Sequence, residues 1–313
     1  MPLNGDVVDS GVNDRSEGHS LGIVCVLLAS ILWGTTGTAS ALAGSVSPLA
    51  MGAASMGVGG LLLAATSAPQ IASSSRLLAA SWPLVIVGGA AVALYSVAFY
   101  TSMRMAGVAI GTAVSIGGAP VASAVLERFL DGRRLTPQWA AGAALGVLGA
   151  VLLSFARGGS GGGESAQTVV GVLLGVLAAS TYAGYSWTSH RLMRLGVPSR
   201  ASVGATFAVA AVVLLAVLVG VGRPFLDSWT NLAVGAYLAA VPMFVGYLLF
   251  GWGLSRVASS TATTVSLAEP VVAAVLAVVV VGERLPWFGW AGMGLIVACL
   301  VALALPGRRR PAG

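Results

Sequence analysis

Glu269 is the residue in this sequence whose type and surroundings most clearly indicate chemistry. It lies about eleven residues into the apolar segment 258–281, with no Arg or His at a similar depth. A charged side chain at the centre of a bilayer costs on the order of 3 kcal/mol, so it is expected to face a cavity or a partner. Either Glu269 binds a cation, an amine or a proton, or it is a protonated acid hydrogen-bonded to backbone that Pro270 leaves unpaired.

Five aromatic side chains lie deep within apolar segments rather than at their ends. They are Trp33, Tyr95, Phe99, Tyr182 and Tyr247. Tyr95 and Phe99 are four residues apart and share one helical face. The sequence predicts these side chains as a substrate-binding or translocation wall that stacks on flat or apolar molecules. The alternative is ordinary packing between helices.

Two prolines, Pro120 and Pro270, fall inside apolar segments where a helix is expected. Each lacks the N–H that would bond to the preceding turn, so each is expected to bend its helix. The bend is either a hinge that moves or a fixed kink that aids packing, because membrane helices tolerate proline in general.

Ser186 and His190, four residues apart, are the residues that favour an alternative in which the protein is an intramembrane enzyme. That spacing places a nucleophile beside a base on one helix, but no third orienting group or oxyanion motif accompanies them. Cys25 and Cys299 lie in apolar runs without metal-type spacing. The sequence therefore predicts no catalytic, metal or cofactor site.

The elements that position these residues are apolar segments, and they define the fold class. Of 313 residues, 57% are hydrophobic and 8% are charged, whereas about 25% are charged in soluble domains. A bilayer crossing takes roughly 20 apolar residues, and within lipid a helix satisfies its own backbone. The sequence predicts an all-α integral membrane protein whose ten transmembrane helices are 21–42, 47–67, 82–103, 107–130, 138–156, 169–190, 202–222, 231–254, 258–281 and 287–306.

The distribution of arginine predicts the orientation in the cytoplasmic membrane. All sixteen basic residues are Arg, and they lie singly or in small groups, which suits membrane topology and not a nucleic-acid partner. With the N-terminus inside, four of them lie outside, and the other twelve lie inside. Both termini are therefore expected to be cytoplasmic by the positive-inside rule. The charges of residues 127–134 are interpreted as exposed pairing around a cytoplasmic turn.

The sequence repeats itself at an offset of 150 residues. Positions 120–153 match 270–303 with 14 identities in 34 positions, and they include the two prolines and a Gly-x-Arg-Leu turn. Trp33 lies opposite Tyr182 at an offset of 149. Each half holds five helices, and because five is odd the second half must enter from the opposite side. The prediction is a 5+5 inverted-topology repeat.

The expected domain boundaries follow from the repeat. Residues 1–20 are predicted as a disordered cytoplasmic tail and 21–156 as the first five-helix repeat. A Gly-rich linker at 157–168 leads to the second repeat at 169–306, and 307–313 form a basic cytoplasmic tail.

The repeated segments resemble the drug/metabolite transporter superfamily, specifically ten-helix members built from two EamA-type domains. The resemblance covers about residues 20–306 and is carried by Leu32-Trp33-Gly34, by Glu269-Pro270-Val271-Val272-Ala273-Ala274, and by Gly282-Glu283-Arg284-Leu285 followed by Gly292. The first half departs from the pattern, because Ala119 precedes Pro120 and Arg133 stands where the family often has Glu.

The resemblance implies a secondary transporter, often an exporter, of small metabolites, amino acids or drugs. Its partners would be the lipid bilayer, a small-molecule substrate and protons as a candidate coupling ion. The central cavity would lie between the two repeats and work by alternating access. A passive channel is the other alternative, although no filter or ring motif is present.

Overall fold

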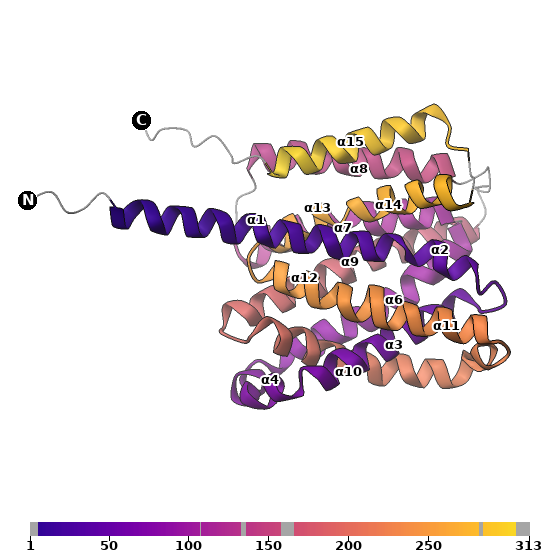
Figure 1. The fold of residues 1–313 in the computed structure, drawn as a ribbon, viewed down its shortest axis with the longest axis horizontal. Helices are drawn as coiled ribbons and strands as arrows, with labels where there is room; N and C mark the ends of the chain where they lie inside the picture. Colours follow the sequence, from indigo (N-terminus) through magenta and orange to yellow (C-terminus); the bar gives the residue numbers. More distant parts are fainter. Residues whose placement is uncertain (1–5, 107, 133–135, 158–165, 282–283, 305–313) are drawn as a thin grey trace, which may run out of the picture.

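The structure is a computed structural model, and it describes residues 6–106, 108–132, 136–157, 166–281 and 284–304. These residues form a bundle of roughly parallel and antiparallel helices (Figure 1). The first half contains α1 (Asp6–Gly34), α2 (Thr36–Ala41), α3 (Pro48–Thr66), α4 (Ala68–Ser73), α5 (Ser75–Ala80), α6 (Trp82–Ala106), α7 (Val108–Leu130) and α8 (Pro137–Arg157).

The second half repeats this order with more interruptions. It contains α9 (Ala166–Arg194), α10 (Ser199–Val221), η1 (Arg223–Leu226), α11 (Trp229–Leu238), η2 (Ala239–Val245), α12 (Gly246–Leu254), α13 (Ser259–Val265), α14 (Ala268–Leu276), η3 (Ala277–Val281) and α15 (Trp287–Ala304). Within the described residues, α11 to α12 form one passage through the bundle and α13 to η3 form another. Each half therefore has five passages, as predicted.

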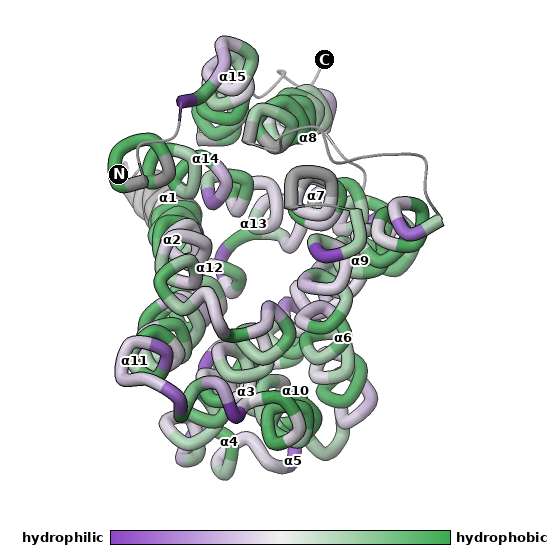
Figure 2. Tube along the Cα trace, turned by 90° about the vertical axis from the view of Figure 1, so that its right-hand side faces the viewer, coloured by the Kyte–Doolittle hydropathy of each residue, from purple (hydrophilic) through white to green (hydrophobic). Residues whose placement is uncertain are grey.

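The helices have the length and the outer surface of a membrane protein. Among the residues that the structure describes, seven helical stretches are long and apolar enough to cross a bilayer, and the apolar helices Pro137–Leu153 and Trp287–Leu303 are shorter. Large apolar side chains point outward from the bundle, and Val219, for example, is 89% exposed. Apolar residues dominate the outer helices in the view along the bundle axis (Figure 2). In water such a surface would be unfavourable, whereas lipid is its natural solvent.

Equivalent helices of the two halves run antiparallel against each other, as an inverted repeat requires. In the α8–α15 pair, Gly142 faces Leu303 while Gly149 faces Gly292 and Ile296. Helices α3 and α10 cross in the same sense, because Gly60 faces Phe207 and Ala211 whereas Gly57 faces Leu214. Glycine at these positions lets the backbones approach closely, which is the packing that stabilises helix pairs in lipid.

The bundle has two distinct ends. The start of α1 and the end of α15 lie at the same end, together with α4 (Figure 1). This end, which also holds the turns 195–198 and 255–258, is called the near end. The far end holds the turns 42–47 and 222–228.

The start of α1 differs from the prediction. The helix begins at Asp6, so residues 6–20 are helical and not a disordered tail. Adding residues to an existing apolar helix avoids the cost of nucleation. The predicted linker lies outside the described residues at 158–165, as does the predicted basic tail at 307–313.

The close approach of α8 and α15 predicts the effect of a single methyl group. A Cβ atom on Gly292 would lie 2.7 Å from the Gly149 carbonyl oxygen and 2.8 Å from the Leu153 nitrogen. We expect Gly292→Ala to destabilise the protein by about 1–3 kcal/mol, because backbone atoms cannot yield as a side chain can. Thermal unfolding of the purified protein in detergent measures this.

The matched control is Gly294→Ala on the same helix. No atom lies within 4 Å of its added Cβ, and alanine has the higher helix propensity. Gly294→Ala is therefore expected to be neutral or stabilising. Equal losses of stability in the two variants would contradict the close packing of α8 on α15.

Candidate functional site

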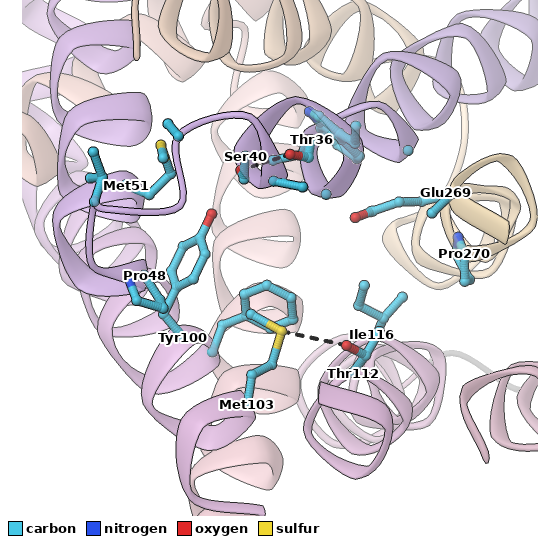
Figure 3. Close-up of a pocket in the computed structure, with 18 of the residues that line it drawn as sticks. Thr36, Ser40, Pro48, Met51, Tyr100, Met103, Thr112, Ile116, Glu269 and Pro270 are labelled. Carbon is cyan, nitrogen blue, oxygen red and sulfur yellow. Dashed lines mark hydrogen bonds between the residues drawn. The ribbon is translucent and has the colours of Figure 1, made fainter. Parts of the chain in front are cut away.

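A cavity of about 570 Å³ lies between the two halves and opens toward the far end. Its walls come from the segment 33–51, from the last turns of α6, from the first turns of α7, and from the start of α14. Glu269 and Tyr100 point into this space from different helices (Figure 3). Its volume falls in the range of about 300–1,000 Å³ that is usual for small-molecule sites.

A second compartment of about 40 Å³ adjoins the first and is lined largely by aromatic rings. The two compartments share Trp33, Phe99, Tyr100 and Glu269. All six residues that the sequence predicts for substrate binding or translocation line at least one compartment: Trp33, Tyr95, Phe99, Tyr182, Tyr247 and Glu269. The structure therefore brings together in space residues that are up to 236 positions apart in the chain.

Glu269 owes its position to a break in the ninth passage. Helix α13 ends at Val265, and α14 starts at Ala268. The Glu269 N–H bonds to the Ser266 carbonyl. No hydrogen bond or ion pair of the Glu269 carboxyl group is present among the described residues, and no Arg or His lines either compartment. The alternative in which Glu269 bonds to unpaired backbone is therefore not what the structure has.

Trp33 and Tyr182, the pair related by the repeat, each bond to a passage of the second half where regular helix is interrupted. The Trp33 Nε1–H donates to the Pro242 carbonyl over 2.9 Å, within the π-helical η2. The Tyr182 hydroxyl lies 2.9 Å from the Ser266 Oγ at the break in the ninth passage. Because Ser266 Oγ itself donates to the Ala262 carbonyl, Tyr182 is the donor.

The remaining aromatic residues form a continuous layer beneath the cavity. Tyr95 stacks on Phe99 with ring centroids 5.4 Å apart, and it lies 5.6 Å from Tyr182. Trp33 contacts Tyr247 at 4.9 Å. Tyr185, Phe207 and Phe250 continue the layer toward the near end and are fully buried. This layer separates the cavity from the near end of the bundle.

The two predicted hinge prolines differ in their surroundings. Pro120 lies inside the uninterrupted helix α7 and is buried. Pro270 lies in the first turn of α14, where a missing N–H costs no hydrogen bond, so the interruption precedes the proline. The break at residues 266–267 lies in the turn that precedes Pro270, where a proline disturbs a helix, so the hinge role of Pro270 stays a prediction. Pro242 in η2, which sequence reasoning missed, is the proline that contacts Trp33.

Several cavity residues escaped the sequence analysis. Tyr100 and Thr36 line both compartments, and Met103 and Thr112 line the larger one. The Thr112 hydroxyl lies 3.5 Å from the Met103 sulfur. The one feature of the sequence that could have identified Tyr100 is that it follows Phe99, which was predicted to line the site. Both residues lie on a turn of α6 that faces the two compartments. The Thr36 Oγ1 has no hydrogen-bond partner among the described residues.

Polar contacts between the halves close the near end. Glu127 of α7 accepts hydrogen bonds from Ser259 Oγ at 2.8 Å, from Ser260 N at 3.1 Å and from Ser260 Oγ at 2.8 Å. One turn further along, Asp131 accepts from Trp187 Nε1 at 2.8 Å and from Arg191 at 3.3 Å. Glu127 is only 2% exposed. The prediction of an exposed charge pair is therefore wrong for this residue, because the start of α13 covers it.

The residues of the enzyme alternative do not form a catalytic pair. His190 Nδ1 bonds to the Leu254 carbonyl at 2.9 Å, and the buried Ser186 hydroxyl has no hydrogen-bond partner among the described residues. The proposed base is therefore engaged with backbone of another helix and not with the proposed nucleophile.

Ten helical passages, arranged as an inverted repeat around a cavity, are the architecture of a membrane transporter. Comparisons with known proteins agree. A family model described as the EamA-like transporter family matches residues 20–155 and 169–305. The chain belongs to the EamA-like transporter family, and it is accordingly a transporter and not an enzyme.

Individual relatives extend over most of the chain. The uncharacterized transporter YwfM of Bacillus subtilis (strain 168) is 32% identical over 288 residues, which are 91% of this chain and 94% of that protein. The aromatic amino acid exporter YddG of Ancylobacter novellus is 29% identical over 268 residues, or 85% of this chain and 89% of the exporter. A solved crystal structure with 23% identity has the same fold, with a TM-score of 0.72 over 90% of this chain and 95% of its own.

The hydrogen bond of Tyr182 at the helix break predicts a measurable contribution to stability. Tyr182→Phe removes only the hydroxyl and leaves the buried Ser266 Oγ without this donor. We expect a loss of about 0.5–1.5 kcal/mol, measured by thermal unfolding in detergent. The matched control is Tyr237→Phe, whose hydroxyl bonds to Thr35 Oγ1 at 2.8 Å on a residue that is 36% exposed.

The two tyrosines form the same kind of bond in different surroundings. Thr35 Oγ1 also donates to the carbonyl of Leu32, in the last turn of α1. Water can replace the Tyr237 hydroxyl but not the buried Tyr182 hydroxyl, so Tyr182→Phe should cost more. A larger loss for Tyr237→Phe would contradict the structural role assigned to Tyr182.

Proposed function

We propose that the protein is a secondary transporter that exports small molecules across the cytoplasmic membrane by alternating access. The observation that supports this best is the cavity between the halves, which opens at the far end and is separated from the near end. A closed aromatic layer and the hydrogen bonds of Glu127 and Asp131 lie between the cavity and the near end. Only one side of the membrane therefore has access to the site.

The inverted repeat supplies a route to the opposite state. When two similar halves adopt different conformations, an exchange of those conformations opens the other end around the same central site. The halves differ here, because the fourth passage is the continuous helix α7 whereas the ninth is broken before α14. Alternating access thus requires rearrangement of elements that are already present in two forms.

The arginine distribution supports an orientation with the near end on the cytoplasmic side. In the topology predicted from the sequence, twelve of the sixteen Arg fall on that side. The structure would then be open to the outside, where an exporter releases its substrate. Both termini would be cytoplasmic.

The lining supports a small organic substrate rather than an inorganic ion. Aromatic rings and methionines surround a single carboxyl group, which is the mixture of apolar walls and few polar groups typical of ligand pockets. The exporter relative is named for aromatic amino acids, and aromatic rings stack on such molecules. Small metabolites, amino acids and drugs with a flat body are therefore the substrates to test.

Transport assays in proteoliposomes test the carrier against the channel. A carrier coupled to protons should accumulate substrate against its gradient, and collapse of the proton gradient should abolish this. We expect Glu269→Gln to abolish or alter the pH dependence of transport, because an amide cannot bind and release the proton. An unchanged pH profile in Glu269→Gln would remove Glu269 from coupling, and purely downhill flux would favour a channel.

The contacts at the near end predict how alternation is controlled. Ser123 lies one turn from Glu127 on α7, and it is buried with an unpaired hydroxyl. In a Cys25→Ser, Cys299→Ser background, Ser123→Cys reports on opening of the near end through its reaction with a maleimide. Adding Glu127→Gln should speed this reaction at least about tenfold, since a hydrogen bond to a charged group stabilises by about 1.5–3 kcal/mol.

Asp227→Asn is the control for this experiment, because Asp227 is exposed near the far end and lines neither compartment. It should leave the reaction rate of Ser123→Cys unchanged. An equal rate with and without Glu127→Gln would show that the Glu127 contacts do not hold the near end closed.

A further inference from the structure

We propose that the Glu269 cavity binds organic ammonium ions with a flat apolar body, and that it discriminates against the corresponding amino acids. The inference deepens the proposed transport function and rests on it for its physiological meaning. The binding site itself can be tested without transport.

The charge of the lining is the first step of the argument. Glu269 contributes the only acidic side chain of the two compartments, and no Arg or His lines either of them among the described residues. The chain contains no Lys. An ionised carboxylate without a counter-charge is unfavourable in a low-dielectric bundle. The positive charge is therefore supplied either by a proton or by the molecule that occupies the cavity.

The second step is the position of the carboxyl group. Glu269 points across the cavity toward the side of α2, where Thr36 and Ser40 lie, while Tyr100 points in from another wall (Figure 3). Tyr100 adds a hydroxyl oxygen to the lining of the same space, and Thr36 adds an Oγ1 that is buried and has no partner among the described residues. An ammonium group beside Glu269 has several N–H donors and can use more than one of these acceptors.

The third step concerns the rest of the ligand. Trp33, Phe99 and Tyr100 line both compartments together with Glu269. Aromatic faces attract cations, and they stack on flat rings. Beyond them the larger compartment is apolar, with Met51, Met103, Ile116, Leu153 and Ala273 in its lining. This arrangement fits a ligand with a charged amine at one end and a flat apolar body.

The fourth step is that a ligand with a carboxylate in addition to its ammonium group is disfavoured. The carboxylate of an amino acid would lie close to Glu269, and like charges in such proximity repel. At the nearby start of α14, three of the four residues 267–270 have no free N–H that could bind an anion in compensation. The Leu267 and Glu269 N–H groups already bond to the Thr264 and Ser266 carbonyls, and Pro270 has no N–H. An amine should therefore bind more tightly than the amino acid with the same side chain.

Four related probes test this with the full-length protein purified in detergent at neutral pH. They are 2-phenylethylamine, phenylalaninamide, phenylalanine and 3-phenylpropionate. They share a benzyl body, and the first two carry an ammonium group without a carboxylate. Isothermal titration calorimetry should show both amines binding at least about tenfold more tightly than phenylalanine, with 3-phenylpropionate the weakest. Phenylalanine binding as tightly as 2-phenylethylamine, or no binding of the amine, would overturn the inference.

Variants then connect the selectivity to the carboxyl group. Glu269→Gln should weaken the binding of 2-phenylethylamine at least about tenfold and reduce the ratio of its affinity to that of phenylalanine. Asp227→Asn should change neither affinity. An unchanged preference in Glu269→Gln would overturn the assignment. If Glu269→Gln does not fold, the comparison of the four probes on the parent protein decides alone.

The outcomes separate this inference from the proposed function. Amine binding that depends on Glu269, without transport in vesicles, would support the ammonium site and contradict the proposed transport function. Transport of phenylalanine with no preference for the amine would keep the transporter and remove the ammonium site.

Discussion

The need to pair the polar groups of the backbone within a low-dielectric bundle is the constraint on which this structure depends. Regular helices meet it for the backbone without outside partners. Where the helix is interrupted, partners must come from elsewhere. The interruptions in the eighth and ninth passages include η2 and residues 266–267, where Trp33 bonds to the Pro242 carbonyl and Tyr182 bonds to the Ser266 side chain. The cavity lies beside both of these interruptions, so the side chains that bond there are also its walls.

Glu127 and Glu269 show the two outcomes that this constraint allows for a carboxyl group. Glu127 is enclosed by three hydrogen bonds from Ser259 and Ser260. Such an acid is satisfied within the protein and joins the two halves at the near end. Glu269 has a cavity in place of donors, and a ligand or a proton must supply what the protein does not. The same residue type thus serves closure in one place and binding in the other.

The general architecture could be predicted from the sequence because length and hydropathy determine it. Apolar stretches of bilayer length can only be helices, and an odd number of them per repeat requires inversion. The depth of Trp33, Tyr182 and Glu269 within their segments was enough to predict a shared central region. The depth of a residue within its segment, however, does not determine which way its side chain faces around the helix axis. Tyr100 and Thr36 face the cavity, and Glu127 faces α13, because of how each helix turns against its neighbours, and periodicity alone does not fix that contact.

The exact extent of the break at residues 266–267 also could not be read from the sequence, because Pro270 predicts only that the helix is disturbed in the turn before it. Because the two halves are repeats, the difference between their equivalent fourth and ninth passages is informative. Ala119 and Glu269 are equivalent by sequence, yet Ala119 is fully buried in continuous α7, whereas Glu269 faces the cavity from the start of α14. A second acid at position 119 would have no cavity to face here. Only the second repeat therefore contributes a carboxyl group to the central site, although the two repeats have the same fold. In the proposed exchange of conformations, the charged wall would stay with the second repeat while access changes around it.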